Sequence, residues 1–181
     1  MPSMIQDFLS NFTDVAKPSR FEVTIGSKSY NDIDPNKLIL RCETAELPSR
    51  TYATAEQKFG SNPVEKFPYQ VQFNDLNLTF IVDDDMLAKY FFDGWLEAVI
   101  PSSNYNPNYK TGPGCYSATI NVKQYDKYHE QSYSVDFLEA YPISVNQLDL
   151  DWSAEGHHKL TVVFAYTSWQ KTSTYRNTLN S

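Results

Sequence analysis

The sequence has few of the residues from which common catalytic and metal sites are built. It contains two cysteines, three histidines and six glycines among 181 residues. The glycines are scattered singly, so no glycine-rich phosphate-binding loop is present. Neither the cysteines nor the histidines have the spacing of a metal site, and no Gly-x-Ser-x-Gly elbow occurs. We therefore predict a protein that is not an enzyme and has no catalytic residue, metal or cofactor.

Long apolar runs are also missing. No stretch reaches the 18 or so residues that a spanning helix needs, and no basic segment precedes the first apolar residues. We expect neither membrane binding nor secretion, and assembly in the cytoplasm of the cell that makes the protein. Cys42 and Cys115 are then expected to be reduced thiols in the core or at an interface.

Acidic residues outnumber basic ones. The counts of 22 and 15 give a net charge of −7. A surface built to grip nucleic acid needs clustered Lys and Arg, so this balance argues against one. It is compatible with a surface that DNA passes without sticking, and equally with ordinary solubility.

Alternation of apolar and polar residues dominates the middle and end of the chain and predicts β-strands. The alternating apolar positions are Phe21, Val23 and Ile25; Leu38, Leu40 and Cys42; Leu76, Leu78, Phe80 and Val82; Tyr116, Ala118, Ile120 and Val122; Tyr133, Val135 and Phe137; Leu148, Leu150 and Trp152; and Leu160, Val162, Phe164 and Tyr166. The last two of these strands are expected to pair through a turn at 154–158.

One helix interrupts the strands. Apolar residues from Leu87 to Ala98 recur at helical spacing. Asp83, Asp84 and Asp85 precede them; a metal site is one interpretation, but capping of the helix fits better. The elements together predict a mainly β protein of two packed antiparallel β-sheets, a sandwich or barrel, with one flanking α-helix.

Two segments are poorly suited to a compact monomer. Residues 50–68 form a predicted long protruding hairpin with little apolar content, which should become stable by pairing with something else. The Pro- and Gly-containing stretch 101–114 is predicted to be a surface loop with a contact role. An apolar-faced arm over 1–19 and a polar tail over 171–181 flank the domain at 20–170.

The order of several short motifs resembles the tail tube proteins of contractile-tailed (T4-like) bacteriophages. These motifs are 20–23, 42–48, the helix that ends near Trp95, 148–152 and 163–169. The resemblance implies a structural virion protein: homo-hexameric rings whose strands join into a β-barrel, stacked into a tube for DNA ejection. It also implies sheath, baseplate and tail-terminator partners, non-specific passage of DNA through the lumen, and location in the virion tail.

Site residues follow from the resemblance and the strand pattern. The hairpin tip is assigned to ring stacking: Lys58, Phe59, Gly60, Ser61, Asn62, Pro63, Val64 and Glu65. Hydrophilic strand faces are assigned to the lumen: Arg41, Glu43, Thr119, Asn121, Lys123, Ser134 and Asp136. Because Lys and Arg hold phosphates, the two lumen candidates Arg41 and Lys123 need acidic neighbours that offset them.

Three other functions stay open at this point. One is a baseplate protein of the same fold that initiates the tube, and another is the inner tube of a phage-derived injection or secretion system. The third is a monomeric ligand-binding β-barrel, which requires an apolar internal pocket.

Overall fold

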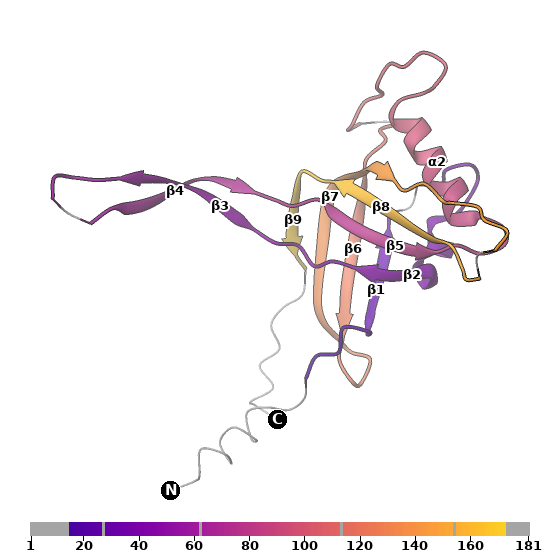
Figure 1. Ribbon diagram of the computed structural model, residues 1–181, viewed down its shortest axis with the longest axis horizontal. Coiled ribbons are helices and arrows are strands. Elements are labelled where there is room, and N and C mark those ends of the chain that lie inside the picture. The colour runs from indigo at the N-terminus through magenta and orange to yellow at the C-terminus, as the bar shows by residue number, and fades with distance from the viewer. Residues whose placement is uncertain (1–14, 27, 62, 113, 154, 173–181) are drawn as a thin grey trace, which may run out of the picture.

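Eleven elements follow one another along the described chain (Figure 1). The computed structural model describes residues 15–26, 28–61, 63–112, 114–153 and 155–172. The elements are β1 (Phe21–Ile25), η1 (Pro35–Arg41), β2 (Cys42–Ala45), β3 (Thr51–Gln57), β4 (Glu65–Gln72), β5 (Leu76–Ile81), α2 (Leu87–Val99), β6 (Ala118–Tyr125), β7 (Gln131–Val145), β8 (Lys159–Ala165) and β9 (Ser168–Lys171).

Seven strands form one antiparallel sheet that turns through the long strand β7. Its order is β1-β6-β7-β8-β5-β2, and β9 also pairs with β7. The first part of β7 pairs with β6 and β9, and its last residues, Tyr141–Val145, pair with β8. Strands β1, β6 and β9 run across the direction of β2, β5 and β8 (Figure 1). The sheet therefore makes two layers: β1-β6-β7-β9, called the first layer, and β7-β8-β5-β2, called the second layer.

The alternating apolar positions fill one core between these layers and the helix. Val23, Ile120 and Phe137 come from the first layer, and Leu78 and Phe164 come from the second; all are buried. Full burial of each such side chain stabilises the fold by about 1.5–3 kcal/mol. The predicted fold class, two packed antiparallel sheets with a flanking helix, is confirmed.

Helix α2 closes one side of this core with an aromatic cluster. Phe91, Phe92 and Trp95 are fully buried, and Trp95 stacks on Tyr30 with ring centroids 5.1 Å apart. The indole Nε1 of Trp95 donates to the backbone oxygen of Tyr116 at 2.7 Å. The three aspartates do not occupy the N-cap position, which is Met86 and has no side-chain cap bond, but the Oδ1 of Asp83 accepts from the backbone N of Leu87 at 3.2 Å.

The predicted strand through Leu38, Leu40 and Cys42 is wrong over most of its length. Residues Pro35–Arg41 form a 3₁₀ helix, and the strand begins only at Cys42. Pro35 at the first helical turn has a φ angle suited to a helix, and the Asp34 side chain accepts from the backbone N of Asn36 at 2.9 Å. These two residues override the alternation, and Leu40 points to solvent with 96% of its surface exposed.

The predicted strand over 148–152 is also wrong. Strand β7 ends at Val145, and after Asn146, which still bonds to Thr161, the described residues 147–153 and 155–158 contain no strand. Alternation alone cannot hold a strand that has no neighbour to accept its backbone hydrogen bonds. Within the described ranges, no helix is long and apolar enough to cross a membrane.

Candidate functional site

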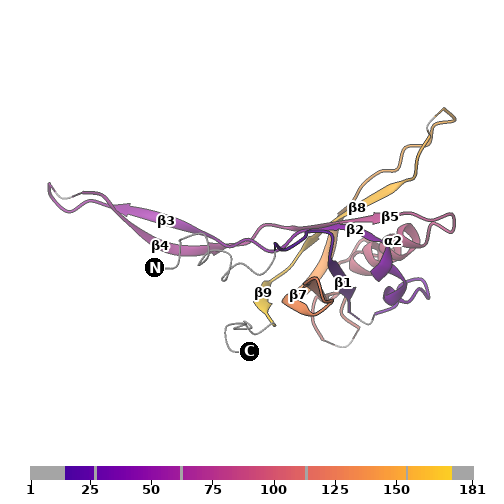
Figure 2. The ribbon, with the colours of Figure 1, turned by 90° about the horizontal axis from the view of Figure 1, so that it is seen from below.

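The hairpin β3–β4 projects far from the rest of the molecule (Figures 1 and 2). It continues the pair β2–β5 along the chain, and its own register joins Thr51 with Gln72 at the base and Gln57 with Glu65 near the tip. All its residues are exposed except Ala53, which is half-buried. The predicted protruding hairpin is confirmed, and it extends four residues further than the predicted end at Pro68.

Apolar side chains lie on this hairpin without a core beneath them. Phe59 is 63% exposed, and Tyr69 and Val71 are also open to solvent. Its one ion pair within the described residues joins Lys66 and Glu56 at 3.3 Å across the strands. Exposed apolar surface on a two-stranded hairpin is typical of a surface that binds another molecule. Of the predicted tip, Asn62 lies outside the described residues.

The base of the hairpin is held by aromatic contacts to the body. The guanidinium of Arg50 lies 4.6 Å from the ring centroid of Trp169 in β9, and Phe73 lies 6.0 Å from Tyr166. The hydroxyl of Tyr166 and the indole nitrogen of Trp169 are buried and lack a hydrogen-bond partner among the described residues. These contacts orient the hairpin with respect to the sheet.

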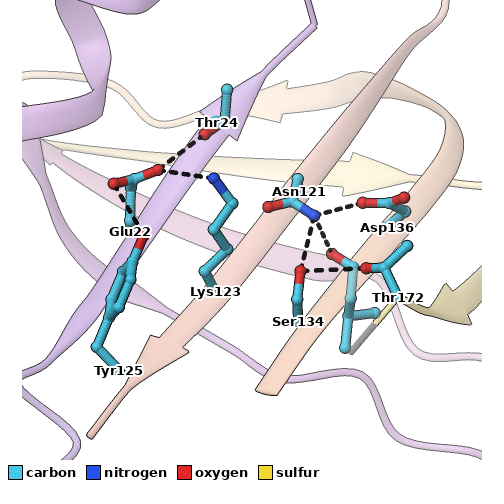
Figure 3. Close-up of polar contacts among 9 residues, drawn as sticks. Glu22, Thr24, Asn121, Lys123, Tyr125, Ser134, Asp136 and Thr172 are labelled. Carbon is cyan, nitrogen blue, oxygen red and sulfur yellow. Dashed lines mark hydrogen bonds and ion pairs between the residues drawn. The ribbon is translucent and has the colours of Figure 1, made fainter. Parts of the chain in front are cut away.

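The outer face of the first layer carries two hydrogen-bonded groups of side chains (Figure 3). Around Glu22, Lys123 donates at 3.0 Å and Tyr125 at 3.2 Å, both to the carboxylate. The hydrogen bond from Lys123 lowers the pKa of Glu22, against the opposing effect of burial. Glu22 is therefore a carboxylate at neutral pH, and it neutralises Lys123.

The second group centres on Asn121 of β6. Its Nδ2 donates to Ser134 Oγ at 3.0 Å and to Asp136, and Thr172 contacts Ser134 at 3.1 Å. Ser134 is only 2% exposed. Five predicted lumen residues thus share this face: Thr119, Asn121, Lys123, Ser134 and Asp136. Of these, Thr119 is the one that is openly exposed.

A second polar face lies on the outside of the second layer. Asn77 and Thr79 of β5 alternate with the buried residues of that strand, as Thr161 does in β8. The hydroxyls of Thr79 and Thr161 lie 3.2 Å apart across the paired strands. Glu43 of β2 accepts from Lys159 at 2.6 Å on the rim of this layer. Glu43 was a predicted lumen residue, but the sequence analysis missed Asn77, Thr79 and Thr161, although the polar half of the alternation over 76–82 and 160–166 contained the signal.

The remaining predicted lumen residue, Arg41, belongs to neither face. Its guanidinium forms an ion pair with Asp83 at 2.5 Å, beside the start of α2. The acidic neighbours that Arg41 and Lys123 required are thus present. The three basic side chains Arg41, Lys123 and Lys159 each have a carboxylate partner, so no unpaired basic cluster forms on either polar face within the described residues.

The described residues include few groups suited to metal binding or catalysis. Among the described residues, no group of three His, Cys, Asp or Glu side chains is placed to hold a metal ion. Cys42 and Cys115 are free, half-buried thiols. Burial raises the pKa of Cys42 to about 12, whereas Lys28, 2.9 Å from the Cys115 sulfur, lowers the pKa of Cys115.

Solved structures with the same fold come from contractile injection systems. A chain in the cryo-EM structure of the anti-feeding prophage tube-terminating cap is 15% identical, covers 90% of this chain and 94% of its own, and has a TM-score of 0.68. A chain in the sheath/tube terminator of the extracellular contractile injection system PVC, in its extended state, is 14% identical over 90% of this chain and 100% of its own, with a TM-score of 0.66. One in the PVC sheath-tube complex is 15% identical over 96% and 100%, with a TM-score of 0.58.

At the level of sequence, no curated protein matches the chain. The profile of one family, described as phage tail tube protein, matches residues 15–172. That range includes every described strand, the helix α2, both polar faces and the protruding hairpin. The chain therefore belongs to the phage tail tube protein family.

Proposed function

We propose that this protein is the major tube subunit of a contractile-tailed bacteriophage, a virion structural protein without enzymatic activity. Six copies form a ring, rings stack into a tube, and DNA leaves through the lumen. The observation that carries the proposal is the hairpin β3–β4, because it extends from a well-packed body and carries exposed apolar side chains on both strands. A monomer gains nothing from such an arm, whereas a stacked subunit gains a contact with the adjacent ring.

Unpaired sheet edges support lateral assembly. Cys42–Ala45 in β2 pairs with β5 alone, and Tyr141–Val145 in β7 pairs with β8 alone, within the described residues. The second layer therefore ends in a free edge on both sides. Two such edges on different copies can pair, and a heterologous contact repeated around an axis closes a ring without leaving an edge exposed.

We assign the lining of the lumen to the polar face of the second layer. Both layers end in free edges, since β1 and β9 of the first layer each pair with one strand, but only the second layer continues directly into the hairpin. Its outer face, with Glu43, Asn77, Thr79 and Thr161, is therefore the proposed lining of the channel. On the first layer, by contrast, Ser134 is buried and its neighbours bond to one another. On the rim of the second layer, Lys159 is paired with Glu43. This face therefore offers DNA phosphates no cluster of free basic side chains.

Electron microscopy of the purified, concentrated protein tests this function. Hollow rings or stacked tubes are expected, and a helical reconstruction would identify the lining. A channel lined by Thr119, Asn121, Lys123, Ser134 and Asp136 would instead confirm the sequence-based assignment of the lumen and refute the choice of the second layer. A protein that stays monomeric both alone and with tail components would refute the tube function.

Isolated particles that contain the protein separate the rival functions. A tube initiator would be present as a single ring in each particle, whereas a tube subunit is present in many. An inner tube that carries protein would assemble equally well but would belong to a particle without a DNA-filled head. Sheath, baseplate and terminator proteins are the expected neighbours in either particle.

A further inference from the structure

The loop between β7 and β8 carries two large apolar side chains in full contact with solvent. Leu150 is 87% exposed, and Trp152 is fully exposed. They border a hollow of about 480 Å³ whose lining also includes Asp149, Asp151, Glu155 and two histidines. We call the described residues 146–153 and 155–158 the distal loop. Neighbouring exposed apolar side chains around a hollow mark a binding surface for another molecule.

Charge narrows the kind of molecule that fits. The distal loop carries three carboxylates, on Asp149, Asp151 and Glu155, and no Lys or Arg between positions 146 and 158. Both Ser153 hydrogen bonds to Asp151, from its backbone N and its hydroxyl, measure 2.9 Å and hold that carboxylate in place. Contact between two distal loops would bring like charges together. The complementary occupant combines an apolar side chain with a positive charge.

The hairpin tip has this combination. Lys58 is followed by Phe59, which is 63% exposed, and Val64, half exposed, lies just before the returning strand β4. No carboxylate partner of Lys58 is found in the described part of the chain, whereas Lys66 is paired with Glu56. The tip therefore offers an unpaired ammonium beside an aromatic ring.

The two surfaces lie at opposite ends of the molecule. In both views the hairpin extends toward one end of the long axis and the distal loop, beyond β8, toward the other (Figures 1 and 2). The seven residues of β3 span about 23 Å at ~3.3 Å per residue, so the tip stands well clear of its own body. A subunit cannot fold its tip onto its own distal loop without bending back along its whole length.

We propose that the hairpin tip of one copy docks on the distal loop of another copy, with Phe59 against Leu150 and Trp152 and Lys58 facing Asp149 and Asp151. This inference rests on the proposed tube function and names the receiving surface for its stacking contact. A tip and a receptor on opposite ends make a heterologous contact that does not close, so copies add in one direction and the stack has a polarity.

Charge exchange between the two surfaces tests the docking. Lys58→Glu alone and Asp149→Lys/Asp151→Lys alone should each form rings but shorten tubes at least about tenfold in electron micrographs, with Tm unchanged since the side chains are exposed. Mixing the two variants should restore tubes, because alternate rings then present matched charges. The triple variant should stack by itself. Tubes of normal length from both separate variants, or failure of the mixture to stack, would overturn the proposal.

Matched controls separate this proposal from the tube function. Asp84→Asn/Asp85→Asn changes the charge as much as Asp149→Asn/Asp151→Asn, but it does so on a different exposed loop, and it should leave tube length unchanged. A wild-type protein that forms neither rings nor tubes, alone or with tail components, refutes the tube function. A wild-type protein that stacks while Trp152→Ala and Asp149→Asn/Asp151→Asn stack equally well refutes only the distal-loop receptor.

Discussion

The backbone oxygen of Tyr116 accepts two side-chain hydrogen bonds, and this predicts a non-additive loss of stability. Trp95 Nε1 donates at 2.7 Å and Tyr30 Oη at 3.0 Å, from rings that stack on each other. Tyr30→Phe removes one donor and leaves the other, so it should cost about 0.5–1.5 kcal/mol. Trp95→Phe should cost more, about 1–3 kcal/mol, because the smaller ring also leaves a cavity.

The double variant leaves this oxygen without either donor. A buried acceptor with no partner costs roughly 1–3 kcal/mol. The loss in free energy of unfolding of the double variant should therefore exceed the sum of the two single losses by at least about 1 kcal/mol. Urea unfolding followed by far-ultraviolet circular dichroism measures the free energy of unfolding of the wild type, the two single variants and the double variant. The protein concentration is kept where sedimentation shows a single subunit. Additivity within about 0.5 kcal/mol would show that water replaces the lost donors, and would refute the inference that this oxygen is dry.

A matched cycle provides the control. The hydroxyl of Tyr166 is buried without a partner among the described residues. Tyr166→Phe should therefore be neutral or slightly stabilising, and additive with Tyr30→Phe.

Three more predictions concern single sites. Iodoacetamide at pH 7.5 should modify Cys115 at least about tenfold faster than Cys42, whose pKa of about 12 keeps it a thiol; mass spectrometry of the peptides decides, and equal rates would contradict the assignment. Gly94→Ala should lower Tm, since an added Cβ would lie 2.6 Å from the Asn31 side chain, and the loss should vanish in an Asn31→Ala background. Glu22 has a lowered pKa, so its contribution to stability is complete above its ordinary pKa of about 4.5 and is lost as pH falls through the pKa of the folded state. Glu22→Gln should therefore reduce the fall in the free energy of unfolding as the solution is acidified. An unchanged dependence on pH would exclude the ion pair with Lys123.

Elements with strong local signals could be predicted from the sequence. The helix α2 was expected from Leu87 because its apolar residues repeat at helical spacing, and the hairpin from the turn around Gly60. The strand predicted around Leu38 was wrong because Pro35 and the N-cap residue Asp34 favour a 3₁₀ helix more strongly than the alternation favours a strand. The strand predicted around Leu150 was wrong because a strand needs a neighbour to pair with. Whether it has one depends on where β7 ends, which is not a local property of the sequence.

The polar faces were only partly predictable. Alternation shows that one side of a strand is hydrophilic, but it does not show which sheet the strand joins. Glu43 and its partner Lys159 are 116 residues apart, and Glu22 and Lys123 are 101 apart. Such pairs are properties of the folded topology, which is why Arg41, Glu43 and the five residues of the first layer were assigned together but lie in three places.

The shared strand β7 also has a consequence for how the subunit folds. It is 15 residues long and carries irregularities in its register against both β6 and β8. A slip of one residue in this strand would turn its apolar side chains outward in both layers at once. Correct pairing on one side therefore enforces correct pairing on the other, so the two layers should form in a single cooperative step. We therefore expect no stable intermediate in which one layer is folded and the other is not.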